Sequence, residues 1–253
     1  IIIQKAIKNN INIYAIHTNL DNVYNGVNNK MASIIGLEKI KILMPKQNLL
    51  KLAVFVPESH SEQVLEAMFK SGAGHIGNYE NCSFSTYGNG TFLPNEGSNP
   101  FKGEVGRLEK AKEIKLEVIL SDFLLTDVIF AMNNAHPYEE VAYDIFKIQN
   151  NSNCGSGMVG ELSEEMDEMK FLKLLKNSFK AKGIRHTKLL NRPIKKVALC
   201  GGSGSFLLKN ALSVKADIFI TSDFKYHQFF ESESKILIAD IGHYESEQYT
   251  IEL

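Results

Sequence analysis

The chain has 253 residues, 44% of them hydrophobic and 23% charged, which is typical of a protein that folds around a buried core. Its formal net charge of -1 argues against nucleic-acid binding driven by bulk positive charge, and no apolar stretch is long enough to cross a bilayer. We therefore expect a cytoplasmic protein that binds no membrane. Nucleic acid is not a favoured partner for it.

The first predicted elements lead to a histidine and an aspartate. Residues 1–9 read as the end of a helix, and because the chain starts inside it without Met, we expect further sequence upstream. Residues 11–16 alternate between apolar and polar, which predicts a short strand. His17 and Asp21 follow it, and ligands of open α/β sheets collect beyond the carboxyl ends of strands. The alternative is a turn in which Asp21 caps the backbone and His17 only packs.

A separate unit is predicted in the middle of the chain, after a helix at residues 30–35 that ends at Gly36. A hairpin around Gly88-Asn89-Gly90 is part of it. Its elements follow the order β-α-β-β-α-β of a ferredoxin-like domain. They are strands at residues 52–56, 116–120 and 141–148, the hairpin with arms at residues 81–87 and 91–93, taken as one β element of that order, and helices at residues 59–70 and 122–133.

The last third of the chain alternates helices and strands, which favours a largely parallel sheet. The helices are predicted at residues 165–182, 206–214 and 225–233, and the strands at residues 196–200, 218–220 and 236–239. Polar borders on both sides of the middle unit divide the chain into residues 1–48, 49–150 and 151–253. Cys82, Cys154 and Cys200 are scattered and odd in number, so we expect core thiols and no disulfide framework.

A second histidine and carboxylate follow the strand at residues 236–239. His243 and Glu247 are four residues apart at a predicted helix start, so they share one face and can close on one ion. Each such pair alone is usually a solvated helix face. Together with His17 and Asp21, they predict a metal site of mixed nitrogen and oxygen ligands.

Two further segments follow strands in the last third. Asp223 and His227 are again an acid and a histidine four residues apart, with a helix cap and a surface histidine as the alternative to orienting a ligand. Gly202, Ser203 and Gly204 lie where backbone amides can cradle a phosphate. This segment lacks the ending of a P-loop, and a tight turn explains it equally well. By contrast, we expect a structural role for residues 136–140 of the middle unit.

These segments resemble the conserved blocks of the NIF-three-like family, whose bacterial members are commonly labelled GTP cyclohydrolase I type 2 homologues. The blocks are residues 15–21, 201–204, 221–227 and 240–247. Residues 72–84, 88–92, 99–101 and 136–144 resemble the PII/CutA-like domain of the longer bacterial members. The resemblance implies an α/β fold, with a two-lobed metal-binding domain interrupted by a ferredoxin-like α+β domain.

The same resemblance implies a dinuclear site for two divalent ions, Zn or Fe, in a ring-shaped hexamer. Asp21, His243 and Glu247 match family ligands, with Glu247 suited to bridging the ions, and His17 lies near them as a ligand or beside one. The family also carries a His-His-Pro motif upstream of the first block. This chain does not contain it, so we expect the metal-binding domain to be incomplete at its N-terminal end.

Three functions remain open at this point. A metal-dependent hydrolase would activate water at one ion while His17 or His227 moves a proton, and the family label points to ring-opening of GTP with the glycine segment near its phosphates. A non-catalytic metal-binding or regulatory oligomeric module is the first alternative. A metal-dependent nucleotide phosphohydrolase is the second.

Overall fold

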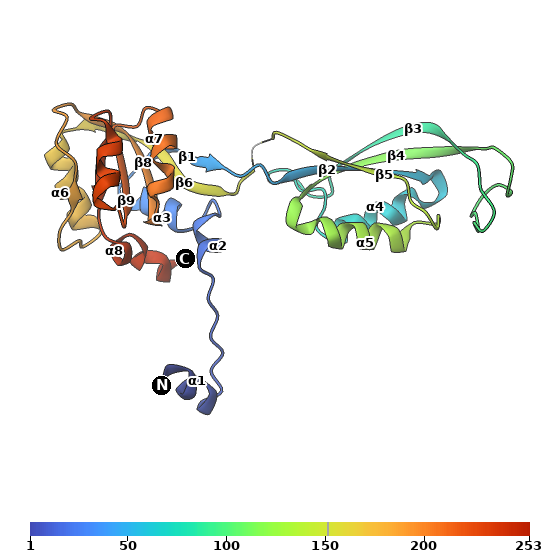
Figure 1. The fold of residues 1–253 in the computed structure, drawn as a ribbon, viewed down its shortest axis with the longest axis horizontal. Helices are drawn as coiled ribbons and strands as arrows, with labels where there is room; N and C mark the ends of the chain where they lie inside the picture. Colours follow the sequence, from blue (N-terminus) through green and yellow to red (C-terminus); the bar gives the residue numbers. More distant parts are fainter. Residues whose placement is uncertain (151) are drawn as a thin grey trace. The chain divides into compact units, whose positions relative to one another are not determined.

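The structure is a computed structural model that describes residues 1–150 and 152–253. It contains two compact units, an α/β unit made of residues 1–46 and 153–253 and an inserted unit made of residues 47–152 (Figure 1). The predicted borders after residues 48 and 150 lie two residues from these, and residue 151 itself lies outside the described part. No helix within the described ranges is long and apolar enough to cross a membrane.

The α/β unit has a six-stranded mixed sheet in the order β1-β6-β8-β9-β10-β7. Its strands are β1 (Glu38–Pro45), β6 (Gly155–Met166), β7 (Arg185–His186), β8 (Ile194–Ser203), β9 (Ile218–Ser222) and β10 (Leu237–Asp240). Only β8, β9 and β10 are parallel, and β1, β6 and β7 join the sheet antiparallel. The prediction of a largely parallel sheet is therefore corrected to a mixed sheet with a parallel centre.

Helices cover both faces of this sheet, because alternate residues of the central strands point to opposite sides. On one face Val197 and Leu199 of β8 join a core with Met31 and Phe171, and on the other Cys200 joins a second core. The helices are α1 (Ile2–Lys8), α2 (Thr18–Asp21), α3 (Val27–Ile34), α6 (Glu168–Ser178), α7 (Leu208–Ser213) and α8 (His243–Glu247). Helices α3 and α6 belong to the first core and α7 to the second.

Three predicted elements of this unit differ in the structure. Residues 11–16 form no strand, because Ile11 and Ile13 are exposed and the segment pairs with no neighbour in the described chain. Helix α6 begins later than predicted because β6 continues to Met166, and the Asp167 side chain then caps the helix. The helix predicted at residues 225–233 is a 3-10 helix, Tyr226–Ser232.

The inserted unit is a four-stranded antiparallel sheet in the order β3-β4-β2-β5, with both helices on one face (Figure 1). Its elements are β2 (Leu49–Pro57), α4 (Ser61–Lys70), β3 (Ser83–Phe92), β4 (Glu109–Ser121), α5 (Leu125–Ala135) and β5 (Tyr143–Lys147). The ferredoxin-like order is confirmed. Its likeness to PII and CutA domains in particular stays a prediction.

The predicted hairpin at Gly88-Asn89-Gly90 is wrong, since residues 83–92 form one strand that pairs with β4 along its whole length. A tight hairpin turn needs backbone angles with φ above zero, and neither Gly88 nor Gly90 has one. A Cβ atom at Gly90 would overlap Glu113 Oε2 of the neighbouring strand. The glycine is thus explained by close approach of a side chain.

Candidate metal centre

A cavity of about 390 Å3 in the α/β unit gathers most of the predicted site residues. Its lining includes His17, Asp21, Gly202, Ser203, His243 and Glu247. These residues come from the segment around α2, from the end of β8 and from α8. The structure therefore brings the first and last parts of the chain together, as the sequence predicted.

Two asparagines anchor the segment that carries Asp21, one through the Asp21 backbone and one through the next residue in the chain. Asn28 is buried, donates from Nδ2 to the Asp21 carbonyl at 2.7 Å and accepts from Gly201 N at 2.8 Å. Asn22 accepts from Ser156 Oγ of β6 at 2.7 Å. Together they tie the α2 segment to β6 and β8. The sequence analysis missed Asn28, which precedes the predicted helix at residues 30–35 but lies inside the observed helix α3.

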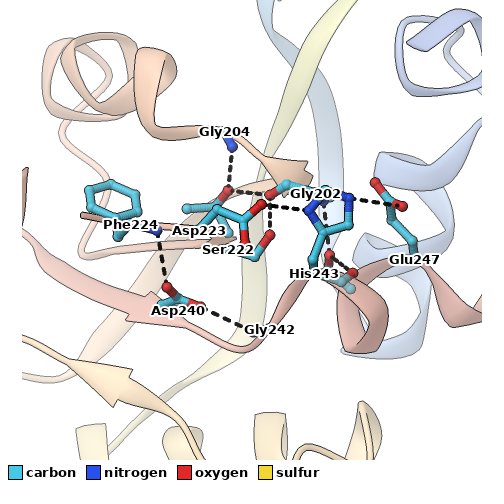
Figure 2. A network of polar contacts seen from close by, with 12 residues as sticks. Gly202, Gly204, Ser222, Asp223, Phe224, Asp240, Gly242, His243 and Glu247 are labelled. Atoms are coloured by element: carbon cyan, nitrogen blue, oxygen red, sulfur yellow. Dashed lines mark hydrogen bonds and ion pairs between the residues drawn. The ribbon is translucent and has the colours of Figure 1, made fainter. Parts of the chain in front are cut away.

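His243 and Glu247 lie on one face of α8, as their spacing predicted, with His243 Nε2 3.4 Å from Glu247 Oε2. The other ring nitrogen, Nδ1, is 2.6 Å from Asp223 Oδ2 (Figure 2). Asp223 adopts a φ of 57°, a left-handed conformation that Asp tolerates better than most residues, so its backbone turn directs the carboxylate to this histidine. The contact orients the imidazole with Nε2 toward Glu247.

Burial is the main cause that raises the pKa of Asp21, and the nearby negative charge of Glu247 adds to it. His17 and His243 act in the opposite direction. The pKa of His243 is raised chiefly by its hydrogen bond to Asp223. Burial, with the charges of Asp21 and Glu247, also raises the pKa of Cys200 to about 12. The cavity is therefore a place of negative potential that a bound cation would neutralise.

Gly202 leaves space for the side chains of Glu247 and His243. Its φ is +62°, and a Cβ there would overlap Glu247 Oε1 and come within 3.4 Å of His243 Nε2. Both peptide groups of Gly202 are fixed. Its carbonyl accepts from Ser222 Oγ at 2.6 Å (Figure 2), and its N donates to Ser246 Oγ at 2.9 Å. Only glycine fits a left-handed backbone this close to the two side chains.

The predicted phosphate cradle at Gly202, Ser203 and Gly204 is not formed. The amide of Gly202 is occupied by Ser246, and the amide of Gly204 donates to Thr221 Oγ1 at 2.9 Å. Gly204 is also absent from the cavity lining, whereas Ser203 is exposed and lines it. The alternative that we left open, a tight turn, describes this segment better, because the backbone donors of both glycines already have partners inside the protein.

His227 is not brought to the cavity. It is exposed on the 3-10 helix Tyr226–Ser232 and is not among the lining residues. Its predicted partner Asp223 instead contacts His243. Of the two residues in that pair, only the acid lies at the site.

The donors fit a divalent cation in their chemistry, since two carboxylates and an imidazole are ligands that Zn and Fe accept. Among the residues that the structure describes, however, no group of three or more His, Cys, Asp or Glu side chains is close enough to hold an ion. Asp21, His243 and Glu247 share the cavity without forming a ready coordination shell, and their role as metal ligands stays a prediction.

A known protein family matches the whole length of the chain. The model of the Duf34/NIF3 (NGG1p interacting factor 3) family matches residues 1–253. Proteins named GTP cyclohydrolase 1 type 2 homolog are similar to it, one from Halalkalibacterium halodurans at 45% identity (89% of this chain, 62% of that one) and one from Bacillus subtilis at 40% (96% and 66%). The chain thus spans about two thirds of their length.

A crystal structure of a Bacillus cereus protein related to NIF3 has a TM-score of 0.76 and 40% identity, covering 99% of this chain and 68% of that one. The two sheets and the mixed α/β architecture agree with that neighbour. The family match over all 253 residues, together with these relatives, means that the chain belongs to the Duf34/NIF3 family.

Proposed function

We propose that the α/β unit binds divalent cations in its cavity and that the protein is a metal-dependent hydrolase of the GTP cyclohydrolase I type 2 homologue class. One observation carries the proposal: Asp21 and Glu247, from opposite ends of the chain, face one cavity beside His243. Gathering two carboxylates costs free energy through mutual repulsion, and a bound cation offsets that cost.

The roles of the chain's own residues follow from their contacts. Asp21, His243 and Glu247 would hold the metal, and Asp223 keeps the proton on His243 Nδ1 so that Nε2 presents its lone pair to the cavity. Asn28 fixes the backbone of Asp21. A divalent ion in this place supplies an acidified water and a positive charge for the developing oxyanion.

We assign the proton transfer to His17. It lines the cavity and is solvent-exposed, so it can exchange protons with water, whereas His227 lies outside the lining. His17 also has a φ of 43°, an unusual conformation at the start of α2 that places its side chain at the cavity.

We extend the proposal to two ions, Zn or Fe, to GTP as the substrate and to a homo-hexamer as the assembly. The name shared by the relatives, GTP cyclohydrolase 1 type 2 homolog, supports a purine nucleotide as the substrate class. The net charge of -1 gives no support to nucleic acid in that role.

A non-catalytic metal-binding module is the second candidate. The observation that favours it is the occupation of the Gly202 and Gly204 amides by Ser246 and Thr221, which leaves these two donors unable to hold a substrate phosphate. In this case the same three ligands bind the cation, and no turnover follows.

Metal titration tests whether the metal site exists, which both the hydrolase and the binding module require. Zn²⁺ affinity should fall at least about tenfold in Asp21→Asn and in Glu247→Gln, because each loses a charged ligand. Glu245→Gln is the matched control, since Glu245 lies on α8 but not in the cavity lining, and its affinity should equal wild type. Unchanged affinity in both site variants contradicts the metal centre.

GTP turnover, followed by chromatography of the products with Zn²⁺ or Fe²⁺ supplied, then decides between the two candidates. Turnover by wild type that is lost in Glu247→Gln and retained in Glu245→Gln supports the hydrolase. Metal binding by wild type without turnover contradicts the hydrolase and leaves the binding module.

A further inference from the structure

The inserted unit contains a second, larger cavity of about 710 Å3. Its lining includes residues of β3, of β4 and of the connection between them, residues 93–108. Figure 1 shows this connection at one end of the sheet of the inserted unit. Its lining includes several aromatic residues, among them Phe55, Phe92, Phe101 and Tyr138. Every lining residue belongs to the inserted unit, so this cavity is a site of that unit alone.

A carboxylate faces this aromatic wall. Glu113 of β4 is partly buried, and its Oε1 accepts a hydrogen bond from the Tyr138 hydroxyl at 2.9 Å. Its Oε2 has no hydrogen-bond or ion-pair partner in the described chain and lies against the backbone of Gly90, where any Cβ would overlap it. Strand β3 therefore has a glycine at the position that leaves this oxygen its space.

The cations of the cavity lining do not neutralise Glu113. Lys115 Nζ lies 2.8 Å from Glu117 Oε1, and Lys102 Nζ lies 3.9 Å from Glu109 Oε1. Glu139 differs from Glu113 because its Oε1 accepts from the amide of Asn99 at 2.8 Å. Within the part of the chain that the structure describes, Glu113 thus contributes a negative charge without a counterion.

The surrounding rings add to the attraction for positive charge. Tyr138 lies in an aromatic cluster, 5.8 Å from Phe92 in an edge-to-face contact and 6.1 Å from Phe101. The faces of such rings carry partial negative charge and attract ammonium groups. An anion would be repelled here, and a neutral ligand would leave the Glu113 carboxylate partly desolvated and without a partner.

We propose that this cavity binds an organic cation, an ammonium group on an apolar or aromatic body, with Glu113 as its counterion. Glu113 binds the ammonium, and the aromatic wall covers the ligand's apolar body. Tyr138 is a positioning residue, because its hydroxyl donates to the carboxylate and holds it in place. Burial and Glu113 together raise the pKa of Tyr138, so its hydroxyl stays a donor at neutral pH.

The test uses three indole probes and the complete chain. Tryptamine carries the ammonium, tryptophol replaces it with a hydroxyl of similar size, and indole-3-acetate carries a negative charge. Titration calorimetry, with chemical shifts as a second readout, should show tryptamine binding at least about tenfold more tightly than tryptophol, and no saturable binding of indole-3-acetate.

Two variants locate the binding. Glu113→Gln should weaken tryptamine binding at least about tenfold, while Glu139→Gln, which removes the same charge from the same cavity wall, should change it by less than about threefold. Gly90→Ala should also weaken binding, because it displaces the Glu113 carboxylate. Melting temperatures of all variants show whether each remains folded.

Three results overturn the proposal: no saturable tryptamine binding by wild type, equal binding of tryptamine and tryptophol, or equal loss in Glu113→Gln and Glu139→Gln. Asp21→Asn in the α/β unit should bind tryptamine as wild type does. That measurement separates this proposal from the metal centre, since either one can fail alone.

Discussion

Replacing Gly202 by alanine tests the geometry of the metal centre. The new Cβ meets two costs: a φ of +62° costs an L-residue roughly 1–2 kcal/mol, and the Cβ overlaps Glu247 Oε1. The carboxylate must retreat by about an ångström to restore ordinary van der Waals contact. Metal–ligand distances vary by only about 0.2 Å, so we expect a retreat of this size to remove Glu247 from the proposed ligand set.

Gly36→Ala is the matched control, because Gly36 has a similar φ of +70° in the same unit but open space around its Cβ position. Both variants should lose roughly 1–2 kcal/mol of unfolding free energy in urea titrations. Only Gly202→Ala should lose Zn²⁺ affinity, by at least about tenfold. If the folded Gly202→Ala protein binds Zn²⁺ as Gly36→Ala does, the position of Glu247 is irrelevant to the metal and the reasoning fails.

Three more predictions concern other groups. The His136 ring accepts a hydrogen bond from Tyr138 N at 3.1 Å and bonds the Phe55 carbonyl at 3.0 Å. Burial lowers the pKa of His136 in the folded chain, so the unfolded chain takes up a proton at a higher pH than the folded chain does. The inserted unit should lose stability as pH falls below the ordinary value of 6.5, and melting curves of wild type and His136→Gln should show a weaker pH dependence in the variant. Cys200, with its pKa raised to about 12, should resist iodoacetamide at about pH 8 unless the protein is denatured, as peptide mass spectrometry would reveal. Replacing residues 47–152 by a short glycine-containing turn should leave the α/β unit cooperatively folded by circular dichroism, and loss of the transition would refute it.

Local chemistry made part of this protein predictable. The strand β10 followed by His243 and Glu247 was found because a continuous apolar strand and a four-residue spacing are both properties of a short segment. The ferredoxin-like order of the inserted unit was found in the same way, from apolar runs separated by polar turns. These features need no knowledge of what lies across the fold.

The misses share one physical reason, which is that each depends on a partner distant in sequence. Residues 11–16 alternate like a strand but meet no neighbour to pair with, and strand formation depends on pairing and burial more than on propensity. Gly90 read as a turn residue, whereas its role is set by Glu113 on the next strand. Asn28 matters because of hydrogen bonds to Asp21 and Gly201, and no spacing rule predicts those.

The pairing of β1 with β6 explains how residues as far apart as Asp21 and Glu247 come to line one cavity. These strands flank the insertion, pair antiparallel up to Pro45 and Gly155, and are linked beyond that by Lys46 N donating to the Cys154 carbonyl at 2.9 Å. Without the inserted unit they would be the two arms of a hairpin. The insertion therefore replaces a turn, and extending a loop between strands that already pair costs little. The sheet that positions Asp21, His243 and Glu247 closes through β1 and β6 themselves, so the inserted unit can be changed without rebuilding the proposed metal site.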